Sequence, residues 1–172
     1  MASSEQGPRI LSDTVSRAIK ARRGELGLSQ EDLALLCGLH RNTLGKIERG
    51  EAQPNILVLS VLLISLGSTG VKVEEDGWDP LYAPASGIDV RSHFQAMRAP
   101  GVIADIGRAI RAARRTEGIS LEKLAAASDL HTNTLWSLES GLVVPSSATV
   151  HRIYRGLGVR SVTLGEEGLV LS

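Results

Sequence analysis

The sequence predicts a mainly α-helical protein in which one domain is present twice, each copy being followed by a short β-strand or hairpin. The first observation is an ungapped repeat: residues 29–54 and 120–145 align at an offset of 91 positions, so that Ser29 corresponds to Ser120. The second is the spacing of apolar residues between glycine breaks, which is helical in both copies. A long ungapped repeat indicates a duplicated domain rather than a solenoid of short units.

Local signals place the helices of the first copy in order. The first helix is expected to end before Gly27, which breaks the apolar pattern. Ser29, followed three residues later by Asp32, forms a weaker version of the capping box and starts the second helix. Gly38 supplies the next turn. After a tail over residues 1–9, the predicted helices cover residues 12–23, 30–37, 41–48 and 56–66.

Strand and linker signals follow these helices. Residues 71–77 predict a strand that runs into a tight Asp-Gly turn, and residues 162–171 predict a second strand or a hairpin. Residues 78–87 are rich in Pro, Gly and Ala and indicate a linker, whereas residues 89–97 indicate a short helix. We therefore expect a first domain over residues 10–76, a linker over 77–100 and a second domain over 101–172.

Composition excludes several classes of protein. The 19 basic and 19 acidic residues balance, unlike the composition of a non-specific nucleic-acid binder. We expect no membrane span and no signal peptide, because the chain has no long uncharged apolar run and no basic start. The single cysteine indicates a reducing cytoplasm. Scattered histidines and the lack of a phosphate-binding glycine loop predict no enzyme, no metal and no cofactor.

The function is predicted to reside in a unit of short helix, turn and short helix. Ala34, like Ala125 in the second copy, is small enough for two helices to cross closely. Gly38 stands where a sharp reversal needs a left-handed residue, a conformation that its counterpart Asp129 tolerates less well. Leucine and isoleucine fill the inward positions. This is the helix-turn-helix pattern, whose second helix enters the major groove of DNA.

A wider set of residues extends this pattern from the first helix to the glycine after the fourth: Arg23, Leu28, Ser29, Gln30, Glu31, Leu33, Ala34, Gly38, Leu39, Thr43, Leu44, Ile47, Glu48, Gly50, Pro54, Leu59, Leu66 and Gly67. With these residues the copies resemble the phage-repressor family of helix-turn-helix domains, also called Cro-like or XRE. The resemblance implies all-α domains of five helices, most of which regulate transcription as dimers on two-fold DNA sites. We therefore expect two tandem five-helix repressor-like domains.

The resemblance places DNA contacts at the start of the first short helix and on the outward face of the second, the recognition helix. Arg41 suits guanine and Asn42 suits adenine, because each side chain can make two hydrogen bonds to that base. His40, like His131, begins its recognition helix and is either a phosphate contact or an ordinary exposed residue. The expected contacts of the first copy are Gln30, His40, Arg41, Asn42, Thr43, Lys46 and Arg49.

The resemblance also implies one ion pair in each copy. Arg23 and Glu48 match a family pair that ties the first helix to the recognition helix, and Arg114 and Glu139 repeat it. Because the pair is present in both copies, we expect it to orient the recognition helix rather than to contact a base.

The second copy lacks the charges of the first recognition helix. Thr132 and Ser137 replace its arginine and lysine, Trp136 replaces a glycine, and Asn133 is unchanged. Two interpretations remain open. This copy binds a different, weaker half-site through Asn133 and Thr132, with Ser137 on the same face, assisted by its basic first helix. Alternatively, it has lost DNA binding and presents Trp136 to a protein partner.

The fourth helix of the first copy is apolar all round. Its inward positions complete the domain core, and Leu57, Val58, Val61 and Ile64 form a second apolar stripe. An exposed stripe of this kind would be an association site. We therefore expect a homodimer through the first copy, or an internal pseudo-dimer in which the second copy, the linker or the strand at 71–73 covers the stripe.

These features together predict a cytoplasmic regulator of transcription that binds double-stranded DNA with sequence specificity, mainly through its first copy. A repressor is expected rather than an activator. The alternative is a protein-interaction regulator, such as an antitoxin or an antiactivator, whose second domain binds a protein partner.

Overall fold

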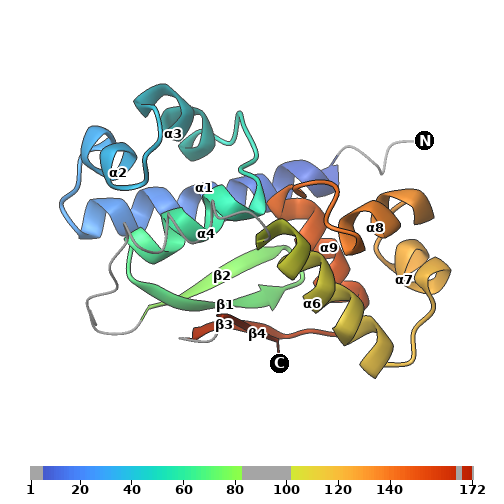
Figure 1. Ribbon diagram of the computed structural model, residues 1–172. Coiled ribbons are helices and arrows are strands. Elements are labelled where there is room, and N and C mark those ends of the chain that lie inside the picture. The colour runs from blue at the N-terminus through green and yellow to red at the C-terminus, as the bar shows by residue number, and fades with distance from the viewer. Residues whose placement is uncertain (1–5, 83–101, 166–167, 172) are drawn as a thin grey trace.

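The computed structural model describes residues 6–82, 102–165 and 168–171, and two sets of helices each precede a β-hairpin (Figure 1). The first repeat contains α1 (Gln6–Glu25), α2 (Gln30–Leu36), α3 (Arg41–Glu48), α4 (Ile56–Ser65), β1 (Ser68–Glu74) and β2 (Gly77–Tyr82). The second repeat contains α6 (Val102–Thr116), α7 (Leu121–Ala127), α8 (Thr132–Glu139), α9 (Ser147–Gly156), β3 (Ser161–Gly165) and β4 (Gly168–Leu171). The last three helices of the two repeats correspond residue for residue, which confirms the mainly helical fold with two tandem domains. Among the described residues each repeat has four helices where five were expected, because a β-hairpin follows the fourth helix. No helix among the described residues is long and apolar enough to cross a membrane.

Caps and turns explain why the short helices have the same bounds in both repeats. The Ser29 hydroxyl accepts a hydrogen bond from the Asp32 amide at 3.1 Å, and the Asp32 carboxylate accepts one from the Ser29 amide at 2.9 Å. After α2 the chain reverses at Gly38, with φ 62°. Its counterpart Asp129 has φ 51° and is the one non-glycine residue with positive φ in the described ranges. The tight turn is therefore kept in the second repeat at some conformational cost.

Two expectations about the ends of the first repeat differ from the structure. The first helix begins at Gln6, inside the expected tail, and residues 77–82 form β2 although they were expected to belong to the linker. Pro80 suggested a loop, but β2 is an edge strand, where a residue without an amide N–H is tolerated. The helix expected over 89–97 lies outside the described residues.

One antiparallel sheet joins the two repeats, with strand order β2-β1-β3-β4. At its centre β1 pairs with β3, and Val71 lies opposite Val162. These two valines occupy corresponding positions in the repeat. A residue and its own counterpart can face each other across antiparallel strands only at a two-fold axis. The register therefore places a pseudo-two-fold axis between β1 and β3.

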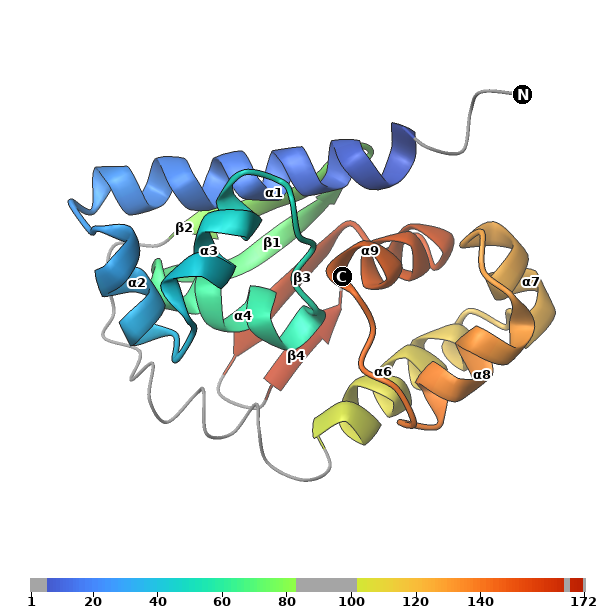
Figure 2. The ribbon, with the colours of Figure 1, turned by 90° about the horizontal axis from the view of Figure 1, so that it is seen from above.

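A second junction lies on the same axis, at the start of α4 and α9. The Ile56 amide donates to the Pro145 carbonyl at 3.1 Å, and the Ser147 amide donates to the Pro54 carbonyl at 3.1 Å. The two bonds are reciprocal, because Pro54 corresponds to Pro145 and Ile56 to Ser147. Seen from above, the α2–α3 and α7–α8 units lie at opposite ends of the molecule, with the sheet between them (Figure 2).

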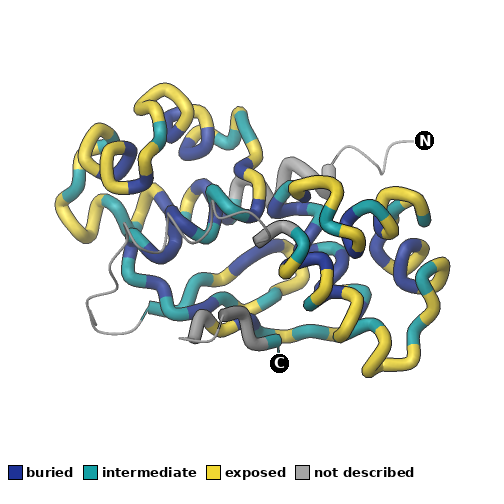
Figure 3. Tube along the Cα trace, viewed as in Figure 1, coloured by how far each residue is buried: buried dark blue, intermediate teal, exposed yellow. Residues whose placement is uncertain are grey.

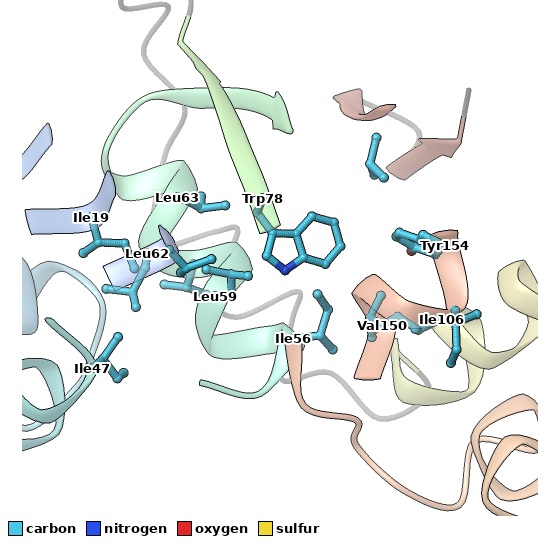
Figure 4. Close-up of a cluster of buried hydrophobic side chains, with 14 of the residues drawn as sticks. Ile19, Ile47, Ile56, Leu59, Leu62, Leu63, Trp78, Ile106, Val150 and Tyr154 are labelled. Carbon is cyan, nitrogen blue, oxygen red and sulfur yellow. The ribbon is translucent and has the colours of Figure 1, made fainter. Parts of the chain in front are cut away.

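The hydrophobic core is also shared between the repeats. Trp78 of β2 is 3% exposed and packs edge-on against two rings of α9, with ring centroids 5.1 Å from His151 and 6.0 Å from Tyr154. Figure 4 shows Trp78 beside Tyr154. Buried side chains of α1 and α4, such as Ile19 and Leu62, belong to the same cluster. The relative position of the repeats is therefore fixed by strand pairing and by side-chain packing together.

The apolar stripe of α4 is covered inside this one chain (Figure 3). Val61 and Ile64 are buried, and Leu57 and Val58 are partly buried. Helix α4 packs against α2, α9 and β1. The homodimer expected through this stripe is therefore corrected: Val61 and Ile64 are not on the surface, and the arrangement is the internal pseudo-dimer.

His151 is the one buried histidine among the described residues, and it gives the fold a pH dependence. Its Nε2–H points at the Glu74 and Gly77 carbonyl oxygens, at 2.9 and 3.1 Å. Burial lowers the pKa of His151, and these two hydrogen bonds offset that effect only in part. The folded protein therefore holds this ring neutral at pH values where a histidine of the unfolded chain takes up a proton.

We expect the free energy of unfolding to decrease as the pH falls below about 6.5, the ordinary histidine pKa. Below that value the unfolded chain binds a proton that folded His151 does not bind, so the unfolded state is stabilised relative to the folded state. Denaturant midpoints measured between about pH 7.5 and about pH 5 test this. His151→Gln should flatten the profile, because it removes the group whose protonation differs between the folded and unfolded states. An equally steep profile in His151→Gln would contradict the assignment.

Candidate nucleic-acid interface

The first recognition helix, α3, separates its inward and outward residues cleanly. Leu44 and Ile47 are buried against the core. The expected base contacts Arg41, Asn42 and Lys46 are all exposed, as is Thr43 beside them. Neither Arg41 nor Lys46 takes part in an ion pair with another residue of the described ranges. Helix α3 therefore presents two cations and an amide to solvent on one surface.

Both recognition helices begin with a histidine cap. Nδ1 of His40 accepts a hydrogen bond from the Asn42 amide at 3.2 Å, and Nδ1 of His131 accepts one from the Asn133 amide at 3.3 Å. The sequence did not predict this role, because histidine is not among the common N-cap residues. The signal available was its position, immediately before a helix in both repeats. His40 remains exposed, so the cap leaves its outer ring edge facing solvent.

A buried ion pair fixes α3 against α1. Arg23 contacts both Glu48 oxygens, at 2.6 and 3.1 Å, and also donates to the Leu28 carbonyl at 2.7 Å. The Glu48 side chain is 1% exposed. Burial alone would raise the pKa of Glu48, but hydrogen bonds from Arg23 and Gln30 outweigh it and lower that pKa. Glu48 is therefore a carboxylate that holds α3 against α1. Because it is buried, it is not accessible to DNA.

Gln30, an expected DNA contact at the start of α2, also belongs to this network. Its side-chain amide donates to Glu48 at 2.7 Å, and the residue is partly exposed. In the second repeat Arg114 and Glu139 form the same paired contact, at 2.6 and 2.8 Å. Leu121 takes the place of Gln30 there and supplies no hydrogen bond. The network is thus complete in the first repeat and reduced in the second.

Arg49 is partly neutralised in the free protein. It forms an exposed ion pair with Glu51 through two contacts of 2.7 and 2.8 Å. An exposed pair of this kind contributes little to stability and can open toward another anion. Arg49 therefore lies in the right region for a phosphate, next to α3, but it has a competing partner.

The corresponding surface of the second repeat is apolar. Asn133 is exposed, while Thr132 and Ser137 are partly buried. Trp136 on α8 is 55% exposed. Leu142, Val143 and Val144, in the loop after α8, are also exposed, where the first repeat has Glu51, Ala52 and Gln53. Trp136 was identified from the sequence, but these loop residues were not, although their apolar run was an available signal.

The exposed cations of the second repeat lie on its first helix, α6. Arg108, Arg111 and Arg115 are exposed, and Arg108 pairs with Asp105. Arg114, by contrast, is held in the buried pair with Glu139. The second repeat therefore carries its exposed cations on α6, whereas the first repeat also carries cations on the recognition helix itself.

Comparisons with known families place a match on each repeat. Residues 19–71 match a family model described as Helix-turn-helix, and residues 105–166 match one described as Helix-turn-helix domain. The first match contains all of α2 and α3, and the second contains all of α7 and α8. Searches of curated proteins and of solved structures found no match.

Proposed function

Because the chain carries two tandem helix-turn-helix domains, we propose that it is a cytoplasmic transcriptional repressor that binds an asymmetric DNA site as a single-chain pseudo-dimer. The supporting observation is the pseudo-two-fold axis between β1 and β3. Helix-turn-helix proteins bind DNA through pairs of recognition helices related by such an axis. Here one polypeptide supplies both helices. Occupying a promoter is sufficient for repression.

The two repeats are proposed to contribute unequally. Arg41, Asn42 and Lys46 give α3 the side chains that hydrogen-bond to base edges and phosphates. Helix α8 offers Asn133 and no exposed charge. The first repeat then supplies most of the sequence specificity, while the second adds a weaker half-site through Asn133 and the arginines of α6. Arg49 and His40 are proposed as backbone contacts.

We expect substitutions in α3 to weaken DNA binding more than the matched substitutions in α8. A bidentate contact from Arg41 to guanine predicts that Arg41→Ala costs roughly 1–3 kcal/mol of binding free energy and relaxes preference at one base pair. Thr132→Ala, at the corresponding position, should cost less. Fluorescence anisotropy on a site selected from randomised duplex DNA measures both, and sedimentation of the complex counts chains per site.

Three results would count against this proposal. Unchanged binding by Arg41→Ala combined with Lys46→Ala would remove α3 as the reading helix. An equal loss in Thr132→Ala combined with Asn133→Ala would show that the second repeat reads bases as fully as the first. Two chains on one site would replace the single-chain pseudo-dimer by an ordinary dimer.

A protein-interaction regulator, such as an antitoxin or antiactivator, is the second candidate. It is favoured by four exposed apolar residues on α8 and the loop that follows it: Trp136, Leu142, Val143 and Val144. Exposed apolar groups that lie together mark association sites, and tryptophan is enriched at their centres. In this case DNA binding by the first repeat would be secondary. Replacing all four residues by serine without any effect on regulation in the cell would rule this candidate out.

A further inference from the structure

A pocket lies beside the pseudo-two-fold axis, between the two repeats. Leu59 and Leu63 of α4 line one side, and Tyr154 and Val162 of the second repeat line the other. Trp78 of β2 also lines it. Its volume is about 40 Å³, which is more than one water molecule needs. Both repeats therefore contribute walls to the same cavity.

The repeat sequence explains why there is space here. Ser60 lines the pocket, and its counterpart in the second repeat is His151, whose ring is buried under Trp78. Gly70 also lines the pocket, and its counterpart is Ser161. At both pairs the first repeat has the smaller residue. The cavity thus follows from the divergence of the two copies.

The pocket is mainly apolar and contains an unused hydrogen-bond donor, the indole N–H of Trp78. Nε1 of Trp78 is buried and has no hydrogen-bond partner among the described residues, and in Figure 4 it points toward Ile56 and Leu59, two residues that line the pocket. The Ser60 hydroxyl donates to the Ile56 carbonyl at 2.8 Å, so only its lone pairs are free. No charged side chain lines the pocket. A buried indole N–H gains most from an acceptor on an otherwise apolar molecule.

We propose that this pocket binds a small uncharged molecule, mainly apolar, with one carbonyl or ether oxygen that accepts a hydrogen bond from Trp78. The lining supports a neutral ligand, since it holds no charged side chain that could pair with an ion. The site is held by α4, α9, β1 and β3, the elements that join the repeats. A role of this ligand as an effector rests on the proposed function. Binding of the ligand in the pocket then changes the relative position of α3 and α8, and this changes the affinity of the protein for DNA.

The test uses acetone as the probe and 2-methylpropene, which has the same shape but no acceptor oxygen, as the control. The indole N–H signals of Trp78 and Trp136 are followed by nuclear magnetic resonance in the full chain, and Trp136→Phe assigns them. Acetone should shift the buried Trp78 signal saturably and leave the exposed Trp136 signal in place. Because water solvates the two molecules differently, the hydrogen bond is measured by the ratio of their affinities in the natural chain and in a variant without the donor.

Two variants separate the pocket from its donor. Ser60→His gives the first repeat the residue of the second and should abolish the saturable shift. Trp78→Phe keeps an aromatic ring but removes the donor, so it should lower the ratio of the acetone affinity to the 2-methylpropene affinity about tenfold, measured by ligand-observed saturation transfer. No saturable shift, or one that persists in Ser60→His, would overturn the site. The titration contains no DNA, so it reports on the pocket even if the proposed function fails.

Discussion

Glu48→Ala is expected to destabilise the protein by about 3–5 kcal/mol, a large fraction of the stability of a typical domain. The substitution removes a carboxylate whose side chain is 1% exposed and leaves the Arg23 guanidinium, 15% exposed, without its partner. It also removes the acceptor of the Gln30 amide. Most of the cost therefore comes from the groups left unpaired rather than from the lost attraction. Chemical denaturation monitored by circular dichroism measures it.

The second repeat supplies the matched variant. Glu139→Ala breaks the same pair with Arg114, but Leu121 stands where Gln30 would donate. Glu139→Ala should therefore cost about 1 kcal/mol less, the usual contribution of one hydrogen bond. Glu51→Ala breaks an exposed ion pair and should change stability little. If Glu48→Ala behaved like Glu51→Ala, the network would not support α3.

Gly70→Val is expected to separate the two repeats. A Cβ atom at Gly70 would lie 2.6 Å from the Val162 carbonyl oxygen and 3.2 Å from Cα of Thr163, so the main chain of β3 would have to move. Valine enlarges that clash with two methyl groups. The cost should be at least the roughly 1–3 kcal/mol typical of overpacking, concentrated at the β1–β3 pairing. DNA affinity should fall toward that of one domain, because the half-sites are no longer held in register.

Ser161 provides the control for this prediction. It corresponds to Gly70 across the pseudo-two-fold axis and already carries a side chain, so Ser161→Ala should leave both stability and DNA binding almost unchanged. Differential scanning calorimetry should show a broader or split transition for Gly70→Val, in place of one cooperative unit. A single sharp transition with unchanged DNA affinity would show that the sheet adapts and that the junction does not set the register.

The local signals of this sequence were sufficient for the helix-turn-helix units, and the two family matches confirm them. Ser29 and Gly38 act within a few residues of themselves, so their effect can be inferred without knowing the rest of the fold. Helix α3 was predicted with the bounds that the structure shows, 41–48. The inward and outward faces followed from helical spacing alone.

The junction between the repeats could not be predicted in the same way. Strand β1 pairs with β3 across about half the chain, and no local signal in either strand specifies its partner. Pro80 is compatible with a strand only at the edge of a sheet, and the edge position of β2 is known only once the strand order is known. The sequence around Pro80 was therefore assigned to the linker. The apolar residues Val61 and Ile64 indicated that a second face of α4 is packed against another element. They did not indicate that this element belongs to the same chain, as the structure shows. The offset of the repeat held a further clue, since Val71 and Val162 align in it.

The pairing of β1 with β3 has a consequence for the number of protein molecules that are needed to occupy a DNA site. A regulator assembled from two separate chains dissociates on dilution, so occupancy of its site falls faster than in proportion to the amount of protein. In the single-chain pseudo-dimer proposed above, the second half is tethered at a constant effective concentration, and occupancy follows the amount of protein in simple proportion. A cell can therefore hold such a site with few molecules. The covalent link also prevents exchange of halves with related chains, so each molecule keeps the pair of recognition helices that it was synthesised with.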